Sequence, residues 1–261
     1  MRPPPLPGLI RRHRLASLAA AALVAVALAA PLTSERSGAA IDSCRAPTGA
    51  ERLNATLPHV AQRIAAGEPV TIVALGSSST EGHGASRPEN SYPSRLAAEL
   101  RSRYPGIEVR VLNKGVGGDT AEKMAARIES DALAENPDLV IWQVGTNDTM
   151  HDADPAEDAA IMRDGVARMK AAGIDVILMD MQYAPGVTSH PVYRDMLHAI
   201  SAAGYAQGAP VFHRFQIMQA WDETQVLPQS LALSEDRLHM NDRSYACLAR
   251  LLADGILAAS R

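Results

Sequence analysis

The strongest constraint on this chain is an apolar run at residues 70–75 (VTIVAL), which stops at Gly76 and is followed by three consecutive serines. A short run of β-branched and aliphatic residues is typical of a strand buried on both faces, as in a parallel sheet. Gly76 allows a tight turn, and polar side chains beyond it stand where open α/β sheets place their ligand crevice. Serines also favour helix N-caps, so this stretch alone does not establish a catalytic site.

Strand-like and helix-like segments alternate along the rest of the chain. Strands are predicted at residues 70–75, 107–112, 139–144, 174–181 and 210–212, and helices at residues 50–66, 92–104, 120–133, 155–172, 192–206, 217–221 and 244–259. This alternation is typical of a parallel sheet with right-handed crossovers. The predicted fold class is α/β, with a three-layer α/β/α sandwich around a mainly parallel sheet of five strands. Charged residues alternate with apolar ones at 107–112, which places that strand nearer an edge.

Length and charge narrow the function classes. The chain has 261 residues and a formal net charge of −4. Residues 1–40 do not resemble part of a fold, and the remaining stretch of about 220 residues suffices for one domain with a sizeable core. We therefore divide the chain into an N-terminal export segment, residues 1–40, and a single domain, residues 41–261. No basic stripe is visible, so no nucleic-acid partner is expected.

Residues 1–40 resemble a secretory signal. Four arginines precede an uncharged apolar run at residues 15–30, and small and polar residues follow it. This order is typical of a signal peptide. The run is shorter than the about 20 residues that a membrane span needs. We expect a periplasmic or secreted protein without stable membrane insertion once the signal is removed; an N-terminally anchored form is the alternative.

The sequence contains two cysteines, Cys44 and Cys247. Export would place them in an oxidising compartment, where an even number of cysteines favours pairing. A bond between them would close a loop of about 200 residues and stabilise the fold by several kcal/mol in the chain-entropy model. We expect this disulfide; two buried free thiols are the alternative.

Three of the predicted strands end in polar loops that contain glycine, at residues 76–80, 113–120 and 145–148. Because the carboxyl ends of parallel strands share one edge of the sheet, these loops should converge on one crevice. Asp236 and His239 lie three residues apart, and on a helical turn both would face that crevice. A hydroxyl, an imidazole, a carboxylate and N–H donors are the groups that nucleophilic acyl transfer requires.

These stretches resemble the four sequence blocks of the SGNH (GDSL-type) hydrolase family, in the family's order and over nearly the whole chain after the export segment. The blocks are Gly76-Ser77-Ser78-Ser79-Thr80, Asn113-x-Gly115-x-x-Gly118-Asp119-Thr120, Gly145-x-Asn147-Asp148 and Asp236-x-x-His239. The resemblance implies a flavodoxin-like fold and esterase or lipase-like activity. It implies Ser78 as nucleophile, His239 as base and Asp236 as the partner of the base. It also implies an oxyanion hole made by the backbone N–H groups of Ser78 and Gly118 and by the Asn147 side chain.

One position departs from the family's pattern. Ser77 stands where the family usually has Asp before the nucleophile, and we interpret it as a variant that changes local hydrogen bonding. The choice of Ser78 over Ser77 or Ser79 rests on the resemblance alone. The pattern Gly-x-Ser-x-Gly is absent because Thr80 occupies its last position, which argues against an ordinary α/β-hydrolase.

Other polar and aromatic residues near the predicted strand ends are weaker candidates. Met150 and Tyr183 follow strand ends and are candidates for the substrate pocket, with ordinary packing as the alternative. His83 is expected to be a solvated loop residue, and His151 to flank the site. No paired metal-ligand spacing occurs among the histidines, carboxylates and cysteines, so neither a metal nor another cofactor is expected.

The leading hypothesis is an exported serine esterase that cleaves carboxylic esters of a small molecule, a lipid or an acylated glycan. A first alternative is an acyltransferase or deacylase that acts on a cell-envelope glycan through the same acyl-enzyme. A second alternative is a non-catalytic glycan- or lipid-binding module, but such a module has no need of all of Ser78, Asn147, Asp236 and His239. The sequence makes no prediction of the oligomeric state.

Overall fold

The computed structural model describes residues 1–4, 44–47 and 49–261. Apart from residues 1–4, the predicted export segment lies outside the described residues. Within them, one parallel sheet has five strands in the order β2-β1-β3-β4-β5. The strands are β1 (Val70–Gly76), β2 (Val109–Gly115), β3 (Leu139–Gln143), β4 (Asp175–Met179) and β5 (Val211–Phe212). The predicted parallel sheet is confirmed, and β2 lies at an edge as expected.

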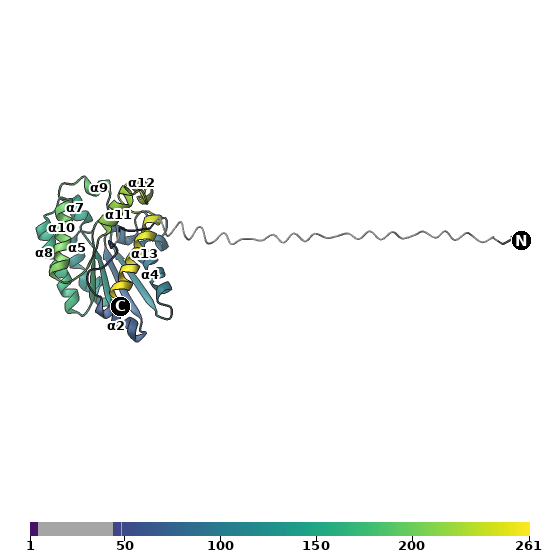
Figure 1. Cartoon of the computed structure of the whole chain (residues 1–261), viewed down its shortest axis with the longest axis horizontal. Helices are drawn as coiled ribbons and strands as arrows, with labels where there is room; N and C mark the ends of the chain where they lie inside the picture. Colours follow the sequence, from purple (N-terminus) through teal and green to yellow (C-terminus); the bar gives the residue numbers. More distant parts are fainter. Residues whose placement is uncertain (5–43, 48) are drawn as a thin grey trace.

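Helices cover both faces of the sheet, which confirms the three-layer sandwich. Figure 1 shows α5, α8 and α10 on one side of the sheet and α4 and α13 on the other. The helices are α2 (Pro58–Ala66), α3 (Ser78–Glu81), α4 (Tyr92–Arg103), α5 (Ala121–Ala126), α6 (Ile128–Asp131), α7 (Thr146–Met150), α8 (Pro155–Ala171), α9 (Pro185–Thr188), α10 (Tyr193–Ala206), α11 (Arg214–Glu223), α12 (Gln229–Ala232) and α13 (Asp242–Ala259), with 3-10 turns η1 (Pro88–Asn90) and η2 (Leu133–Glu135).

Each inner strand is buried on both faces, which explains its continuous apolar sequence. In β1, Ile72 and Ala74 belong to the hydrophobic cluster beneath α4 and α13, whereas Val73 and Leu75 belong to the cluster beneath α5, α8 and α10. Side chains of a strand alternate between faces, so a strand between two helix layers needs apolar residues at every position.

The strand registers bring several carboxyl ends to one edge of the sheet. Gly76 at the end of β1 pairs with Gly115 at the end of β2, and Gln143 at the end of β3 pairs with Met179 at the end of β4. The loops that follow these strands therefore lie side by side. Short helices α7, α9 and α12 gather at this end of the molecule, at the top of Figure 1.

Two predicted helices differ from the observed ones. The first helix begins at Pro58 instead of residue 50, because proline is favoured in the first turn of a helix, where its missing N–H is not needed. The helix predicted over residues 120–133 is divided into α5, α6 and η2. Thr120 caps α5 as expected, but Arg127 leaves the helical conformation, with φ −109° and ψ 14°. Its side chain is used elsewhere, as described below.

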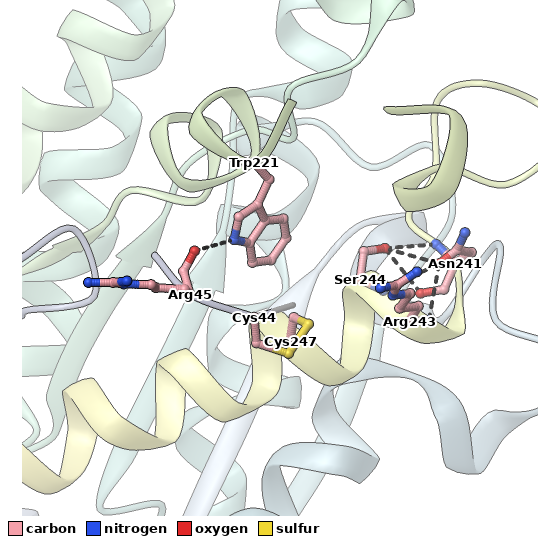
Figure 2. Close-up of a disulfide and its surroundings, with 7 residues drawn as sticks. All are labelled: Cys44, Arg45, Trp221, Asn241, Arg243, Ser244 and Cys247. Carbon is pink, nitrogen blue, oxygen red and sulfur yellow. Dashed lines mark hydrogen bonds between the residues drawn. A yellow bond between two sulfur atoms is a disulfide. The ribbon is translucent and has the colours of Figure 1, made fainter. Parts of the chain in front are cut away.

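The segment that follows the predicted export signal is attached to the domain by a disulfide bond. Cys44 is bonded to Cys247 of α13, as predicted, and the carbonyl of Arg45 accepts a hydrogen bond from Trp221 Nε1 at 3.0 Å (Figure 2). Asn241 forms a capping box with Ser244 at the start of the same helix. In the part of the chain that the structure describes, no helix is both long and apolar enough to span a membrane.

We predict that the disulfide contributes strongly to stability. It links residues that are 203 positions apart, so it restricts the unfolded chain considerably. Replacing both cysteines by serine should lower the free energy of unfolding in urea by roughly 2–5 kcal/mol. Wild-type protein reduced with dithiothreitol keeps both side chains and is the matched control; it should unfold near the same midpoint as the variant. Equal midpoints for reduced and oxidised wild type would contradict the prediction.

Candidate active site

Ser78, His239 and Asp236 form a continuous line of hydrogen bonds at the carboxyl edge of the sheet. Ser78 Oγ lies 2.7 Å from His239 Nε2, and His239 Nδ1 lies 2.6 Å from Asp236 Oδ2. The His239 side chain is 11% exposed and that of Asp236 is 47% exposed. The structure thus brings together a hydroxyl, an imidazole and a carboxylate in the order that a Ser-His-Asp triad requires.

The three consecutive serines have different surroundings. Ser77 and Ser79 are buried, and their hydroxyls bind carboxamide oxygens of glutamines: Ser77 binds Gln143 Oε1 at 3.1 Å and Ser79 binds Gln182 Oε1 at 3.5 Å. The hydroxyl of Ser78 faces the imidazole instead. The geometry therefore separates the three candidates, which the sequence distinguished only by resemblance.

Thr80 packs closely against the backbone of Gly76, two residues before Ser78 at the start of α3. A Cβ atom at Gly76 would lie 2.0 Å from Thr80 Oγ1 and 2.7 Å from Thr80 Cβ, so any larger residue would displace this side chain. Gln143 Oε1 accepts hydrogen bonds from the Ser77 N–H, the Ser77 hydroxyl and the Thr80 hydroxyl. The sequence analysis expected local hydrogen bonding to differ because Ser77 replaces the family's usual Asp, and these are the hydrogen bonds that Ser77 makes.

Asp236 and His239 are not on a helical turn, so that part of the prediction is wrong. Asp236 Oδ1 accepts the backbone N–H groups of Leu238 and His239, both at 2.9 Å, and Arg237 between them has φ +56°. Aspartate favours such local turns because its carboxylate competes with helical hydrogen bonds. The carboxylate that holds the imidazole thus also shapes the backbone that carries it.

Electrostatics keeps the Asp236 carboxylate charged at neutral pH. Partial burial acts to raise its pKa, but the hydrogen bond with His239 and the N–H groups of Leu238 and His239 outweigh burial and hold the pKa well below its usual range. A charged Asp236 accepts a hydrogen bond from the N–H at Nδ1 of His239. The Nε2 lone pair is then directed at the Ser78 hydroxyl, as a general base requires.

The loops that carry the predicted oxyanion donors Gly118 and Asn147 contact each other. The Asn147 amide at the start of α7 donates one N–H to the carbonyl of Asp119 at 2.8 Å, which fixes its orientation. Gly118 has φ +79°, a conformation that favours glycine, and a Cβ there would meet no atom within 4 Å. A Cβ at the neighbouring Gly117 would lie 4.0 Å from Ser78 Cβ, so this loop borders the nucleophile candidate.

Arg127 joins two of the loops and was missed by the sequence analysis. Its guanidinium donates hydrogen bonds to the carbonyls of Gly76 and Lys114 and to the Asp119 carboxylate, each at 2.8 Å. These partners are the end of β1, the end of β2 and the loop that follows β2. No motif marks this arginine, because its partners come from three separate segments.

A buried polar cluster behind the serines was also missed. Gln182 Oε1 accepts hydrogen bonds from Thr146 Oγ1 and Arg214 Nη2, each at 2.9 Å, in addition to Ser79. Arg214 is fully buried, and burial lowers the pKa of its guanidinium; its Nε donates to the carbonyl of Asp180. Polar residues directly after β4 are the one signal in the sequence that could have indicated this cluster.

The weaker candidates are distributed around the site. His83 is solvent-exposed, as expected, but its ring centroid lies 5.2 Å from that of His239, and its Nδ1 lies 3.4 Å from Glu81 Oε2. Met150 is half-buried at the end of α7, and His151 is exposed beside it. Tyr183 lines a cavity farther along the sheet edge. Among the described residues, no cluster of three or more His, Cys, Asp or Glu side chains could hold a metal ion.

The fold and the line of hydrogen bonds define an SGNH-type hydrolase. A protein-family model described as the non-GDSL lipase-like family matches residues 43–261, and the chain belongs to this family. That description agrees with the presence of Ser77 in place of the usual Asp.

Characterised relatives are esterases. An acetylxylan esterase from Geobacillus stearothermophilus is 30% identical over 153 residues, which cover 51% of this chain and 68% of the relative. An arylesterase from Vibrio mimicus is 29% identical over 112 residues, which cover 43% of this chain and 54% of the relative.

Solved structures share the fold. A two-domain esterase active on acetylated mannans has a TM-score of 0.65 and 21% identity; the match covers 76% of this chain and about half, 52%, of that protein. An acetylxylan esterase from Geobacillus stearothermophilus has a TM-score of 0.59 and 26% identity, covering 72% of this chain and 94% of that structure. The family and the esterase relatives identify this protein as a serine carboxylic ester hydrolase.

Two carboxylates lie behind the Asn147 loop. Asp148 is buried, and its Oδ1 accepts the Ala121 N–H at 2.7 Å, which fastens α7 to α5; burial raises its pKa despite this bond. Asp158 of α8 is also buried. Burial and the nearby Asp148 carboxylate, together with other acidic neighbours, raise the pKa of Asp158 to about 7.

We predict that Asp158 makes stability fall as pH rises. An unfolded Asp has a pKa of about 3.9, so the folded protein holds this proton more tightly. The contribution of Asp158 is fully present below about pH 4 and is lost as pH rises through about 7. In urea titrations, the free energy of unfolding should therefore fall less between pH 5 and pH 8.5 in Asp158→Asn than in wild type. Glu89→Gln, an exposed carboxylate on η1 that is not among the neighbours raising the pKa of Asp158, is the control. A loss in Asp158→Asn equal to that of wild type would contradict the prediction.

Proposed function

We propose that this esterase forms an acyl-enzyme on Ser78, with His239 as the general base and Asp236 as the carboxylate that orients it. The observation that carries the proposal is the pair of short contacts, 2.7 Å from Ser78 Oγ to His239 Nε2 and 2.6 Å from His239 Nδ1 to Asp236 Oδ2. A serine hydroxyl is a weak nucleophile until a neighbouring base takes its proton. An imidazole in this position can do so.

The reaction follows from these contacts. His239 Nε2 takes the proton of Ser78 as the hydroxyl oxygen attacks the ester carbonyl, and Asp236 stabilises the resulting imidazolium. When the tetrahedral intermediate collapses, the bond to the alcohol oxygen breaks and His239 returns the proton to that oxygen. Water then attacks the acyl-serine by the same route, which releases the acid and restores the Ser78 hydroxyl.

The oxyanion of each tetrahedral intermediate would be held by three N–H donors. These are the backbone N–H groups of Ser78 and Gly118 and the second N–H of the Asn147 amide, whose first is occupied by the Asp119 carbonyl. Donors that are oriented before the reaction cost no reorganisation when the charge develops. The fixed Asn147 side chain and the left-handed turn at Gly118 support this assignment.

The substrate we propose is a short-chain acyl ester of a glycan. Relatives include an acetylxylan esterase and an esterase active on acetylated mannans. The polar pair Glu81 and His83 borders the nucleophile, where it would face a hydroxylated alcohol portion more favourably than an apolar one. The hydrogen-bonded triad argues against a non-catalytic binding module.

Hydrolysis and acyl transfer to a glycan use the same acyl-enzyme and differ in the acceptor. Incubation with an acetyl donor and an excess of unacylated oligosaccharide distinguishes them: hydrolysis releases free acetate, whereas transfer yields acetylated oligosaccharide. We expect acetate.

We also infer that the protein acts outside the cytoplasm, in the periplasm or secreted, because its structure contains a disulfide, a bond typical of oxidising compartments.

The nucleophile assignment predicts the result of covalent labelling. A fluorophosphonate probe should label one serine, Ser78, because that hydroxyl contacts His239. Ser78→Ala should abolish both labelling and turnover of p-nitrophenyl acetate, as measured by mass spectrometry and absorbance. Ser79→Ala, a change next to the nucleophile, should keep the label. Labelling that persists in a folded Ser78→Ala protein would refute the assignment.

The oxyanion assignment predicts a selective loss of kcat in Asn147→Ala. Removal of one oxyanion donor typically lowers kcat by about 10²–10³, so steady-state kinetics with p-nitrophenyl acetate should show a loss of this size. Circular dichroism should show an unchanged fold. Thr146→Ser, which keeps the hydroxyl that binds Gln182, is a control from the same loop and should retain near wild-type kcat. An unchanged kcat in folded Asn147→Ala protein would mean that this amide does not contact the oxyanion.

A further inference from the structure

A concave region lies on the same sheet edge as the triad. It is a cavity of about 510 Å³ at the ends of β4 and β5, lined by residues from the segment after β4, from α10 and from α11. None of the residues assigned to catalysis above lines this cavity. Tyr183, which the sequence indicated as a candidate for substrate contact, forms part of its wall.

The cavity lies within reach of a substrate bound at the triad. β4 is two strands away from β1, which corresponds to roughly 10 Å along the sheet edge at the usual strand spacing. Two contacts join the stretch after β4 to the residues around the triad. Gln182, beside Tyr183, binds Ser79, and a Cβ at Gly186 of α9 would lie 3.1 Å from Leu238, the residue before His239.

Three aromatic rings form one wall. Tyr183 meets Phe215 edge to face with ring centroids 5.2 Å apart, and Tyr193 stacks on Phe215 at 5.7 Å with an interplanar angle of 23°. Phe215 is buried, whereas both tyrosines are partly exposed. Rings in mutual contact are rigid, and both tyrosines add a hydroxyl group to this wall. The guanidinium carbon of Arg194 lies 5.3 Å from the Tyr193 ring centroid and adds N–H donors beside it.

Polar groups held in fixed orientations form the other wall. Asp180 Oδ1 accepts the Phe215 N–H at 2.8 Å, and its Oδ2 lies 3.2 Å from His213 Nδ1. The Asp180 side chain is 4% exposed, and its hydrogen bond raises the pKa of His213. Gln216 and Gln219 of α11 add amides that both donate and accept hydrogen bonds.

We propose that this cavity is a saccharide subsite, which binds a sugar unit of the glycan away from the one that carries the scissile ester. The inference rests on the proposed function and specifies where its substrate binds. A pyranose presents apolar C–H faces and hydroxyls that donate and accept, which matches the aromatic wall and the polar wall. An acyl chain would fit less well, because polar groups of the second wall such as Gln216 and Gln219 would lose contact with water and gain no hydrogen-bond partner.

The test compares substrates that reach the cavity with one that does not. We would measure kcat/KM for p-nitrophenyl acetate, for p-nitrophenyl esters of longer acids and for acetylated xylo- and manno-oligosaccharides of increasing length, in wild type and in Tyr193→Ala. Because Tyr193→Ala removes one aromatic contact, it should lower kcat/KM for the longer oligosaccharides roughly tenfold by raising KM. The kcat/KM for p-nitrophenyl acetate should be unchanged. Tyr205→Ala, a nearly fully exposed tyrosine on the same helix, is the matched control and should behave like wild type.

Direct binding separates this inference from the proposed function. Unacylated oligosaccharides titrated into Ser78→Ala protein should bind in calorimetry, and Tyr193→Ala in that background should weaken binding by a similar factor. Equal length dependence in wild type and Tyr193→Ala would overturn the subsite. So would a loss confined to p-nitrophenyl esters of long acids, since it would show an acyl pocket. Either result would reject only the subsite if the protein still turns over p-nitrophenyl acetate and Ser78→Ala abolishes that turnover. Turnover that persists in Ser78→Ala would instead contradict the proposed catalytic role of Ser78.

Discussion

The Arg127 guanidinium holds together the strand ends from which the active site is built. The Gly76 carbonyl at the end of β1 accepts the Val116 N–H at 3.0 Å, and Arg127 adds a second hydrogen bond to it. Arg127 supplies donors to Gly76 at the end of β1 and to Lys114 at the end of β2, and it binds the Asp119 carboxylate as well. Ser78, the proposed nucleophile, follows Gly76 by two residues, and the loop proposed to bind the oxyanion lies between Lys114 and Asp119. Arg127 thus adds to the β1–β2 ladder and the Val116 N–H in fixing the relative position of the two.

A neutral polar layer beneath Ser78 explains the departure from the family's first block. Gln143 Oε1 already accepts three hydrogen bonds, two of them from the backbone and hydroxyl of Ser77. An aspartate at position 77 would bring a carboxylate into this buried setting, where a charge is costly unless hydrogen bonds pair it. Serine supplies a donor of suitable length. The substitution and Gln143 thus form one arrangement, which keeps the residues flanking the nucleophile buried while Ser78 alone contacts His239.

The sequence was informative wherever a feature is local. Runs of apolar residues predicted the strands, and glycine-containing loops at their ends predicted where the site would lie. The roles of Ser78, Asp236 and His239 came from the family resemblance, and the structure places the three in contact. Features that depend on distant segments were not predictable. Arg127 binds a carbonyl 51 residues earlier, and Gln182 binds a serine 103 residues earlier, without any periodicity to mark them. The Asp236 turn was misjudged as helical because spacing alone does not show that a carboxylate binds the next backbone N–H groups.

The separation of Ser78 and His239 by 161 residues raises the question of what holds a 2.7 Å contact in place. The loop after α3 packs on the turn that carries the base: Tyr245 donates to the carbonyl of His83, and a Cβ at Gly84 would lie 2.2 Å from the Met240 carbonyl. Both anchors adjoin α13, which Asn241 caps and which the disulfide at Cys247 ties to the start of the domain. These contacts fix the turn that carries His239 to the loop that follows Ser78, and α13 connects that turn to the core.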